Sequence, residues 1–211
     1  MALYGENYTR YQLDRGLARR VVRQLYLRSA ARELRGPTVD FGCGVGDLLQ
    51  LLPAGSLGLD INPVSVDYCR SRGLDARLYD GDADGWYLEP LGATRGLQSL
   101  VISHVLEHLE QPVEKLARLL RACERLGIEH ALVVVPGLRA YERDDTHCTF
   151  VDLPMLSSTA ATAGTGFRMI CSRYFPCNLR VIAQGLPHHE LQVSYRRVGG
   201  GRLTTPAPRR P

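Results

Sequence analysis

The sequence lacks the patterns that mark membrane-spanning, secreted and zinc-binding proteins. None of its apolar runs approaches the roughly 20 residues that cross a bilayer, and residues 1–6 do not show the charged-then-apolar order of a secretory signal. Its six cysteines form no CxxC pair, which argues against a zinc site or a disulfide framework. We therefore expect a cytoplasmic protein that does not bind membranes and keeps its cysteines as free thiols.

Lysine is also scarce, because Lys115 is the only one among 26 basic residues. The formal net charge is +4, and arginines cluster in residues 1–35 and 202–211. Such clusters are typical of a solvated helix face and a disordered end, and a polyanion-binding patch is the less favoured alternative. A chain of 211 residues suits one hydrophobic core. We predict a helical segment at 1–36, one domain at 37–198 and a disordered tail at 199–211.

Short apolar segments alternate with longer amphipathic ones along most of the chain. The expected strands are residues 38–41, 56–60, 76–79, 97–103 and 131–135, with two more near 167–174 and 191–197. The expected helices are residues 9–35, 48–52, 63–72, 112–126 and 153–163, and the expected loops are residues 80–94 and 137–151. This alternation predicts an α/β fold, in which a doubly wound, mostly parallel sheet carries helices on both faces.

Three glycines at alternate positions separate the first expected strand from the next helix. Gly42, Gly44 and Gly46 allow a sharp turn and let a ligand lie against bare peptide groups, with helix N–H donors beyond. A dinucleotide-binding loop would carry its third glycine one place later, where this chain has Asp47. An acid is an awkward neighbour for a pyrophosphate, whereas Asp40 would favour a ligand with a free ammonium group. The loop therefore disfavours a nicotinamide dehydrogenase.

Acidic residues follow the second and third expected strands. Asp60 ends residues 56–60, and a carboxylate there could accept hydrogen bonds from both hydroxyls of a ribose. Asp80 or Asp82, just past residues 76–79, could accept one from the amino group of adenine. Each could instead cap a helix or a turn. Together they place acids where open α/β sheets bind ligands, at the carboxyl ends of strands.

These segments together resemble class I S-adenosylmethionine-dependent methyltransferases. Residues 39–46 are similar to the first motif of that family, residues 58–61 to its acidic motif, and residues 81–83 to its adenine-contact motif. Residues 103–109, Ser-His-Val-Leu-Glu-His-Leu, resemble the fourth-strand signature of the small-molecule branch that includes ubiquinone-biosynthesis and other "type 11" methyltransferases. With the matches at residues 134–136 and 147–167, the likeness runs from about residue 38 to 175.

The resemblance implies a Rossmann-like, seven-stranded sheet with one antiparallel strand, and S-adenosyl-L-methionine as the cofactor with S-adenosyl-L-homocysteine as its product. It assigns cofactor contacts to Asp40, Gly42, Gly44, Asp60 and Asp82. We also expect Cys43, Ile61, Ala83 and His104 to contact the cofactor. The resemblance leaves open whether Asp80 or Asp82 meets the adenine. The chain departs from the pattern at residues 126–130, where the usual glycine pair is missing, and at residues 86–95, an insertion that suggests a lid.

Methyl transfer from a sulfonium requires mainly that the acceptor be held in line and water be excluded. A base is needed only when the acceptor starts as a hydroxyl or ammonium. His147, in the loop 137–151, is the first candidate base, and a role in fixing that loop is the alternative. His104 is the second candidate, and shaping the methyl site is its alternative. Glu107 and His108 are expected to organise the turn after the fourth strand.

Two polar clusters remain. Residues 144–147, Asp-Asp-Thr-His, could hold a divalent ion with Glu107, but we predict no metal. Residues 188–190, His-His-Glu, are expected to be an exposed loop. Tyr4, Tyr8 and Tyr11 are expected to close over the cofactor, or else to pack or be disordered.

The favoured function is O-methylation of a hydroxyl on a small molecule, in cofactor or secondary metabolism. N- or C-methylation and non-catalytic binding of S-adenosylmethionine are the alternatives. Methylation of nucleic acid is disfavoured, because residues 103–106 lack an Asn/Asp-Pro-Pro-aromatic motif and no basic, aromatic RNA-binding segment is present. The expected partner is the small methyl acceptor, and the expected state is a monomer or homodimer.

Overall fold

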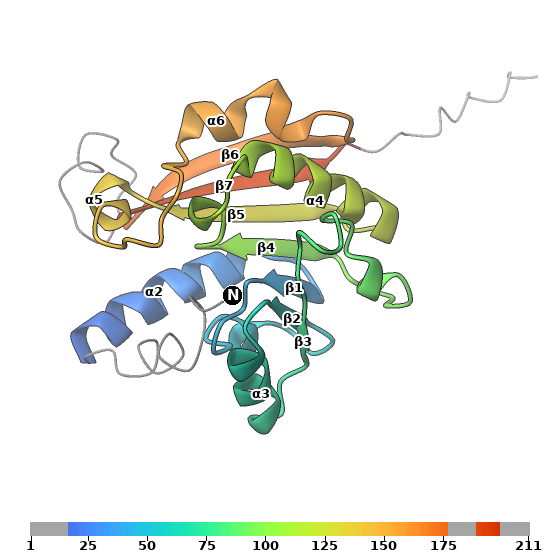
Figure 1. Cartoon of the computed structure of the whole chain (residues 1–211), viewed down its shortest axis with the longest axis vertical. Helices are drawn as coiled ribbons and strands as arrows, with labels where there is room; N and C mark the ends of the chain where they lie inside the picture. The colour runs from blue at the N-terminus through green and yellow to red at the C-terminus, as the bar shows by residue number, and fades with distance from the viewer. Residues whose placement is uncertain (1–16, 177–188, 199–211) are drawn as a thin grey trace, which may run out of the picture.

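The computed structural model describes residues 17–176 and 189–198, with side chains from Arg23 onward, and these residues build a seven-stranded sheet between helices (Figure 1). The strand order is β3-β2-β1-β4-β5-β7-β6. All neighbours up to β5 pair in parallel, and β7 is antiparallel to both β5 and β6. The strands are β1 (Thr38–Phe41), β2 (Leu57–Asp60), β3 (Ala76–Leu78), β4 (Ser99–Ser103), β5 (His130–Pro136), β6 (Phe167–Phe175) and β7 (Glu190–Arg197). The α/β, doubly wound, mostly parallel sheet expected from the sequence is confirmed.

The helices are α2 (Leu17–Glu33), α3 (Pro63–Ser71), α4 (Pro112–Leu126), α5 (Leu138–Tyr141) and α6 (Leu153–Ser157). Shorter 3₁₀ turns are η2 (Leu49–Leu51), η3 (Glu89–Leu91), η4 (Leu106–His108) and η5 (Thr159–Thr162). Local signals explain several ends. Asn62 caps α3 by accepting from the N–H of Val64. Gly127, with φ 78°, ends α4 in a left-handed C-cap.

The alternation of side chains along the central strands divides the core between the two faces of the sheet. Val101 of β4 and Leu132 of β5 are buried with Leu27 and Ala30 of α2. Their neighbours in the chain belong to a larger cluster on the other face, where α4 packs. β5 is buried along its whole length, as expected for a central strand covered on both faces.

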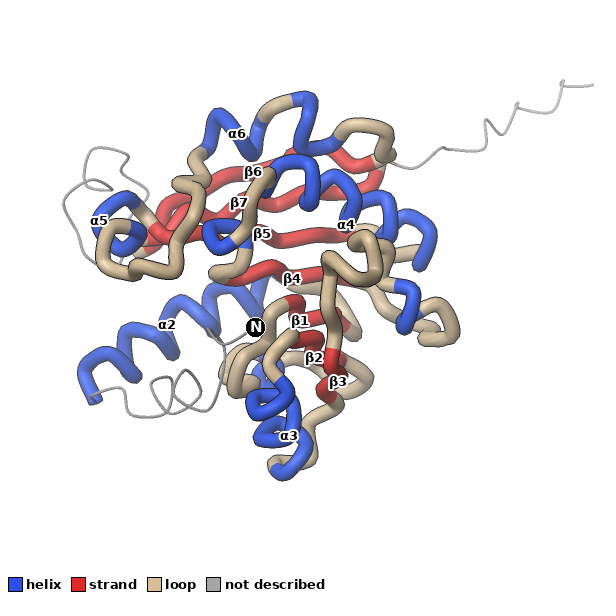
Figure 2. Tube along the Cα trace, viewed as in Figure 1, coloured by secondary structure: helices blue, strands red, loops and turns tan. Residues whose placement is uncertain are grey.

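Three expected elements differ in the structure. The helix expected at 48–52 is only the 3₁₀ turn η2. The helix expected at 153–163 is interrupted at Ser158, whose extended backbone (ψ 152°) ends α6, and whose side chain then accepts from the N–H of Ala161 in η5. The loop expected at 137–151 contains the short helix α5. The tube view shows this region, between β5 and β6, as loops broken by short helices (Figure 2).

The order of the strands places a crevice at the centre of the sheet. The chain runs from β1 outward to β3 and then returns across the sheet to β4, so β1 and β4 are neighbours whose following segments leave in different directions. In open α/β sheets, ligands bind at the carboxyl ends of the strands at this position. No helix among the described residues is long and apolar enough to span a membrane. Residues 1–16, with the three tyrosines, and the tail 199–211 lie outside the described residues.

Candidate active site

The glycine-rich loop lies between β1 and η2, and its conformation requires glycine. Gly42, Gly44 and Gly46 have φ values of 75°, 52° and 78°, in the left-handed region that favours this residue. A Cβ atom on Gly42 would overlap Cγ2 of Val105, and one on Gly46 would lie 2.7 Å from Cδ1 of Leu74. The loop therefore presents bare peptide groups, and those of Gly42 and Gly44 line a cavity.

Asp60, at the end of β2, holds this loop in place. Its Oδ2 accepts from the N–H of Gly44 at 2.7 Å, and its Oδ1 accepts from the N–H of Asn62 at 2.8 Å. Burial raises the pKa of Asp60, and the two N–H donors act in the opposite direction. The next residue, Ile61, is 47% exposed and adds apolar surface to the cavity wall.

Asp40 and Cys43, two further residues of the predicted cofactor site, differ in their exposure to the cavity. Asp40, at the third position of β1, is 2% exposed and does not line the cavity. Its Oδ2 has no hydrogen-bond partner among the described residues. Burial and the charge of Asp60 raise the pKa of Asp40 to about 7. Cys43 lines the cavity, and the five cysteines among the described residues are free thiols.

The acids after β3 are held in a tight turn at the edge of the cavity. Oδ1 of Asp80 accepts from the N–H groups of Asp82 and Ala83, at 3.0 and 3.1 Å. Oδ1 of Asp82 accepts from Nε1 of Trp86 at 3.0 Å and lies 3.2 Å from Nζ of Lys115. Asp80 and Asp82 both line the cavity, and Ala83 does not. Asp80 thus stabilises the turn through backbone hydrogen bonds, whereas the side chain of Asp82 is held by Trp86 and Lys115.

The segment 86–95 is not a lid, contrary to the hypothesis drawn from its insertion-like sequence. Trp86, Leu88 and Leu91 are 5%, 0% and 0% exposed and belong to the main hydrophobic core. The Trp86 indole lies 5.7 Å from the ring of Phe41, centroid to centroid. The buried side chains of Trp86, Leu88 and Leu91 anchor the segment in the core, and Trp86 is its one residue that lines the cavity.

His104 lies directly after β4, between two buried carboxylates. Its Nδ1 is 3.2 Å from Oε1 of Glu107, and its Nε2 is 3.0 Å from Oε1 of Glu190. Burial lowers the pKa of an imidazole, but the charges of Glu190 and Glu107 outweigh that effect and raise the pKa of His104 to about 10. His104 therefore already carries the proton near neutral pH, which makes it a poor general base. It also has a left-handed backbone (φ 56°), an uncommon conformation that tends to occur at functional sites.

Glu107, His108 and His147 meet beside His104, and each offers a ligand atom within 4.8 Å of the others. Nδ1 of His147 lies 2.8 Å from the carbonyl oxygen of Tyr141, so the N–H is placed there and the lone pair is on Nε2. Nε2 of His147 is 3.9 Å from Oδ2 of Asp144. Burial raises the pKa of Asp144, but hydrogen bonds from Thr146 outweigh it and lower that pKa.

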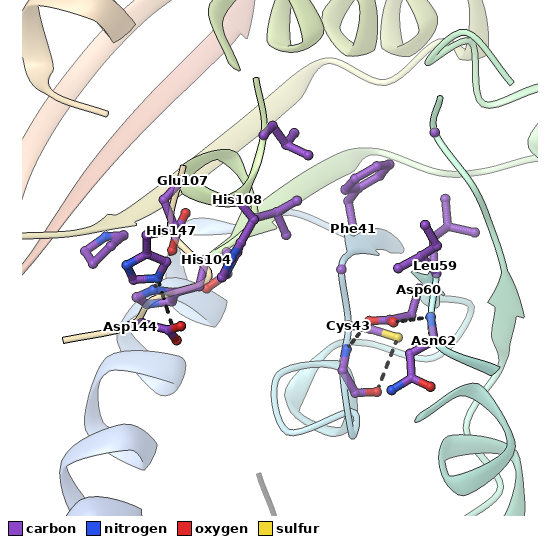
Figure 3. Close-up of a pocket in the computed structure, with 18 of the residues that line it drawn as sticks. Phe41, Cys43, Leu59, Asp60, Asn62, His104, Glu107, His108, Asp144 and His147 are labelled. Atoms are coloured by element: carbon purple, nitrogen blue, oxygen red, sulfur yellow. Dashed lines mark hydrogen bonds and ion pairs between the residues drawn. The ribbon is translucent and has the colours of Figure 1, made fainter. Parts of the chain in front are cut away.

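These two ends are joined in a single cavity of about 540 Å³. Figure 3 shows Phe41, Cys43, Asp60 and Asn62 on one side, and the group formed by His104, Glu107, His108, Asp144 and His147 on the other. Of the predicted site residues, those that line the cavity are Gly42, Cys43, Gly44, Asp60, Ile61, Asp82, His104 and His147. Its size suits a small-molecule site.

Several residues that line the cavity were not identified from the sequence. Glu190 was expected in an exposed loop with residues 188 and 189, but Glu190 is 6% exposed and His189 is 0% exposed, so that expectation is wrong. β7 pairs with β5 so that Glu190 faces Pro136, which brings it to the site. His188 lies outside the described residues. Arg23 and Tyr26 of α2 also line the cavity, and Nε of Arg23 bonds Oδ2 of Asp47 at 2.8 Å.

Comparison with known proteins supports the fold. No family model matches the chain. A SAM dependent methyltransferase from Archaeoglobus fulgidus superposes with a TM-score of 0.65 at 20% identity, over 90% of this chain and 99% of that chain. Magnesium protoporphyrin IX methyltransferase from Synechocystis PCC 6803, with bound SAM, gives 0.58 at 14% identity, over 84% of this chain and 81% of that chain. The protein thus has the Rossmann-like fold of these methyltransferases.

One curated relative is similar over part of its sequence. It is an uncharacterized RNA methyltransferase from Parasynechococcus marenigrum (strain WH8102), 35% identical over 116 residues. The match covers 46% of this chain and 25% of that protein, so the chain spans about a quarter of the relative's length.

Proposed function

We propose that this protein is an S-adenosylmethionine-dependent methyltransferase that methylates a hydroxyl group of a small molecule. The observation that carries the proposal is the shared cavity, which joins a glycine-rich loop with an acid at one end to a histidine and carboxylate cluster at the other. The fold, which solved methyltransferase structures share, supports the same activity. When bound, S-adenosylmethionine supplies an electrophilic methyl group on a sulfonium.

The residues at the loop end fit such a cofactor. The bare peptides of Gly42 and Gly44 admit close approach, and a Cβ on Gly42 would clash with its surroundings. The carboxylate of Asp60 lines the cavity and has acceptor capacity beyond its two backbone donors, which suits ribose hydroxyls. The exposed apolar side chain of Ile61 suits the face of a flat base.

We assign the adenine amino group to Asp82 rather than Asp80. Oδ1 of Asp80 already accepts two backbone N–H groups of its own turn. Asp82 has a side chain that is 73% exposed, and contacts with Trp86 and Lys115 fix its position at the cavity edge. Asp40 is buried and does not line the cavity, so it acts through its charge, which would favour a bound ammonium group.

The residues at the far end fit a hydroxyl acceptor. A hydroxyl must lose its proton during transfer, and a lone pair on Nε2 of His147 can accept a proton or coordinate a cation. His104 acts as a positioning residue that holds Glu107 and Glu190. The motif at residues 103–109 supports the "type 11" branch and an acceptor from cofactor or secondary metabolism. A cytoplasmic location and a monomeric or dimeric state remain predictions.

A transfer assay with S-adenosylmethionine carrying a tritiated methyl group tests the function. The acceptor panel contains phenols, catechols and hydroxy acids, small amines, carbon acids and total RNA. We expect label on a hydroxylated small molecule, and a loss of roughly 100-fold or more in His147→Gln. Asp145→Asn, an exposed change in the same loop, should keep the activity.

Other outcomes separate the alternatives. Label found only on an amine or carbon acceptor would replace O-methylation by N- or C-methylation. Label found only in RNA, the class of acceptor named for the curated relative, would overturn the small-molecule acceptor. Binding of S-adenosylhomocysteine with no transfer to any acceptor would indicate a binding protein.

A further inference from the structure

We propose that Glu107, His108 and His147 form a binding site for one divalent first-row transition-metal ion at the acceptor end of the cavity. The three side chains come from two segments, the turn after β4 and the loop after α5, which the fold brings together. Their ligand atoms lie within 4.8 Å of one another. With metal–ligand bonds of about 2.0–2.2 Å, a small rotation of the side chains would let one ion contact all three. Figure 3 shows the three side chains grouped on one side of the cavity.

The two imidazoles are oriented in the way that metal-binding histidines are. Nδ1 of His147 faces the carbonyl oxygen of Tyr141 at 2.8 Å, and Nδ1 of His108 faces that of Thr146 at 3.2 Å. A carbonyl oxygen can only accept, so each Nδ1 carries the hydrogen and each Nε2 carries a lone pair in the neutral ring. Backbone carbonyls that fix the tautomer in this way are the usual outer partners of histidine ligands.

The carboxylate of Glu107 supplies an independent sign that a cation belongs here. Glu107 is 0% exposed, and only its Oε1 is bonded, to Nδ1 of His104 at 3.2 Å. Its Oε2 is buried and has no hydrogen-bond partner among the described residues. A buried carboxylate oxygen without a partner is costly. A metal ion between Glu107, His108 and His147 would satisfy it.

Asp144 adds further negative charge to the same place. Its Oδ2 lies 3.9 Å from Nε2 of His147, so two lone-pair donors face each other. Oδ1 of Asp144 is already held by the N–H and hydroxyl of Thr146, at 3.0 and 2.6 Å. A cation between them would remove the repulsion between these two lone pairs and would also give Oε2 of Glu107 a partner. Asp144 is thus placed as a fourth ligand or as a counter-charge.

The ligand set indicates the kind of ion. Two imidazoles and one carboxylate suit Mn²⁺, Fe²⁺, Co²⁺ or Zn²⁺, whereas Mg²⁺ and Ca²⁺ prefer sites made of oxygen. An ion here would sit in the wall of the cavity, where an oxygen of the methyl acceptor could complete its coordination. That last role rests on the proposed function, but the metal site itself does not. With the ion bound, His147 serves as a ligand rather than a base.

Direct metal binding tests the proposal. The full chain is stripped with EDTA and titrated with Mn²⁺, and the free ion is followed by its electron paramagnetic resonance signal. Mn²⁺ is used because the exposed thiols of Cys148 and Cys171 would compete for softer ions. We expect one Mn²⁺ per chain, displaced by Zn²⁺ but not by an equal concentration of Mg²⁺.

Matched variants show whether these residues hold the ion. Glu107→Gln and His147→Gln should each weaken Mn²⁺ binding at least tenfold, while Asp145→Asn, in the same loop, should leave it unchanged. Circular dichroism checks that each variant folds, and if Glu107→Gln does not, His147→Gln decides. No binding up to about 1 mM Mn²⁺, or binding that survives both ligand variants, would overturn the proposal.

Titration of the same samples with S-adenosylhomocysteine separates this proposal from the proposed function. Binding of the nucleoside without Mn²⁺ binding would overturn only the metal site. Binding of Mn²⁺ without the nucleoside would uphold the metal site and count against the methyltransferase.

Discussion

Buried carboxylates around the cavity are each stabilised in a different way. Asp60 is held by two backbone N–H groups, and Glu190 by the imidazolium of His104. Asp40, Glu107 and Glu190 each keep one carboxylate oxygen without a hydrogen-bond partner among the described residues. Because an unpaired buried acid is unfavourable, these three residues are the places where a ligand would most improve the local electrostatics.

Asp60→Ala should both destabilise the protein and weaken nucleoside binding. The change leaves the N–H groups of Gly44 and Asn62 without their acceptors, which costs about 1–3 kcal/mol for each buried donor that finds no water. We expect urea denaturation to show a lower free energy of unfolding. Asp67→Ala, at an exposed position on α3, serves as the control and should change that free energy by less than about 0.5 kcal/mol. An equal loss in both variants would contradict the role assigned to Asp60.

Asp40 should make the stability depend on pH. Its folded-state pKa, about 7, lies above the ordinary value of 3.8 for an aspartate, so the folded state binds this proton more tightly than the unfolded state does. The stabilisation is present below pH 3.8 and is lost as pH rises through 7. Between about pH 5.5 and pH 8 the loss is about 2 kcal/mol. Urea denaturation at both pH values should show a fall that is larger in the wild type than in Asp40→Asn by about 2 kcal/mol; the same fall in both proteins would count against a raised pKa.

Helix α2 should depend on one face for its attachment to the sheet. Leu27 is 2% exposed and packs with Val101 and Leu132, whereas Leu25, two residues earlier, is 56% exposed. Leu27→Ala should lower the free energy of unfolding by about 2–4 kcal/mol, and Leu25→Ala should change it by less than about 0.5 kcal/mol. Chemical denaturation measures both. Similar values for the two variants would show that α2 is not anchored as described.

At the scale of elements, the sequence was most informative where the hydrophobic period was long or the turn chemistry strong. The period in residues 112–126, with Pro112 at the first turn and Gly127 after the last, predicted α4 correctly. The segment 48–52 was too short for its period to distinguish a helix from a 3₁₀ turn. Ser158 interrupted the predicted helix 153–163 because its side chain caps the following turn instead of continuing the first.

At the scale of the whole molecule, the residues at the loop end of the cavity could be predicted from the sequence, and those at the histidine end only in part. Asp60 and the glycines belong to local motifs at strand ends, so their meeting follows from a parallel sheet. Glu190 comes to His104 through the antiparallel pairing of β7 with β5, between residues 86 positions apart. No local sequence pattern predicts that pairing. The packing of Trp86 beside Phe41 also depends on the tertiary structure, so the sequence alone suggested that residues 86–95 are an insertion.

Isothermal titration of the full chain with S-adenosylhomocysteine and with NADH tests the central claim most directly, because it asks what the loop end of the cavity binds. The account predicts a Kd in the micromolar range for S-adenosylhomocysteine, on the order of −7 to −8 kcal/mol, with no measurable binding of NADH. Asp60→Asn, which keeps one carbonyl acceptor for the loop, should raise the Kd for S-adenosylhomocysteine at least tenfold. No binding of S-adenosylhomocysteine, or tighter binding of NADH, would contradict the account.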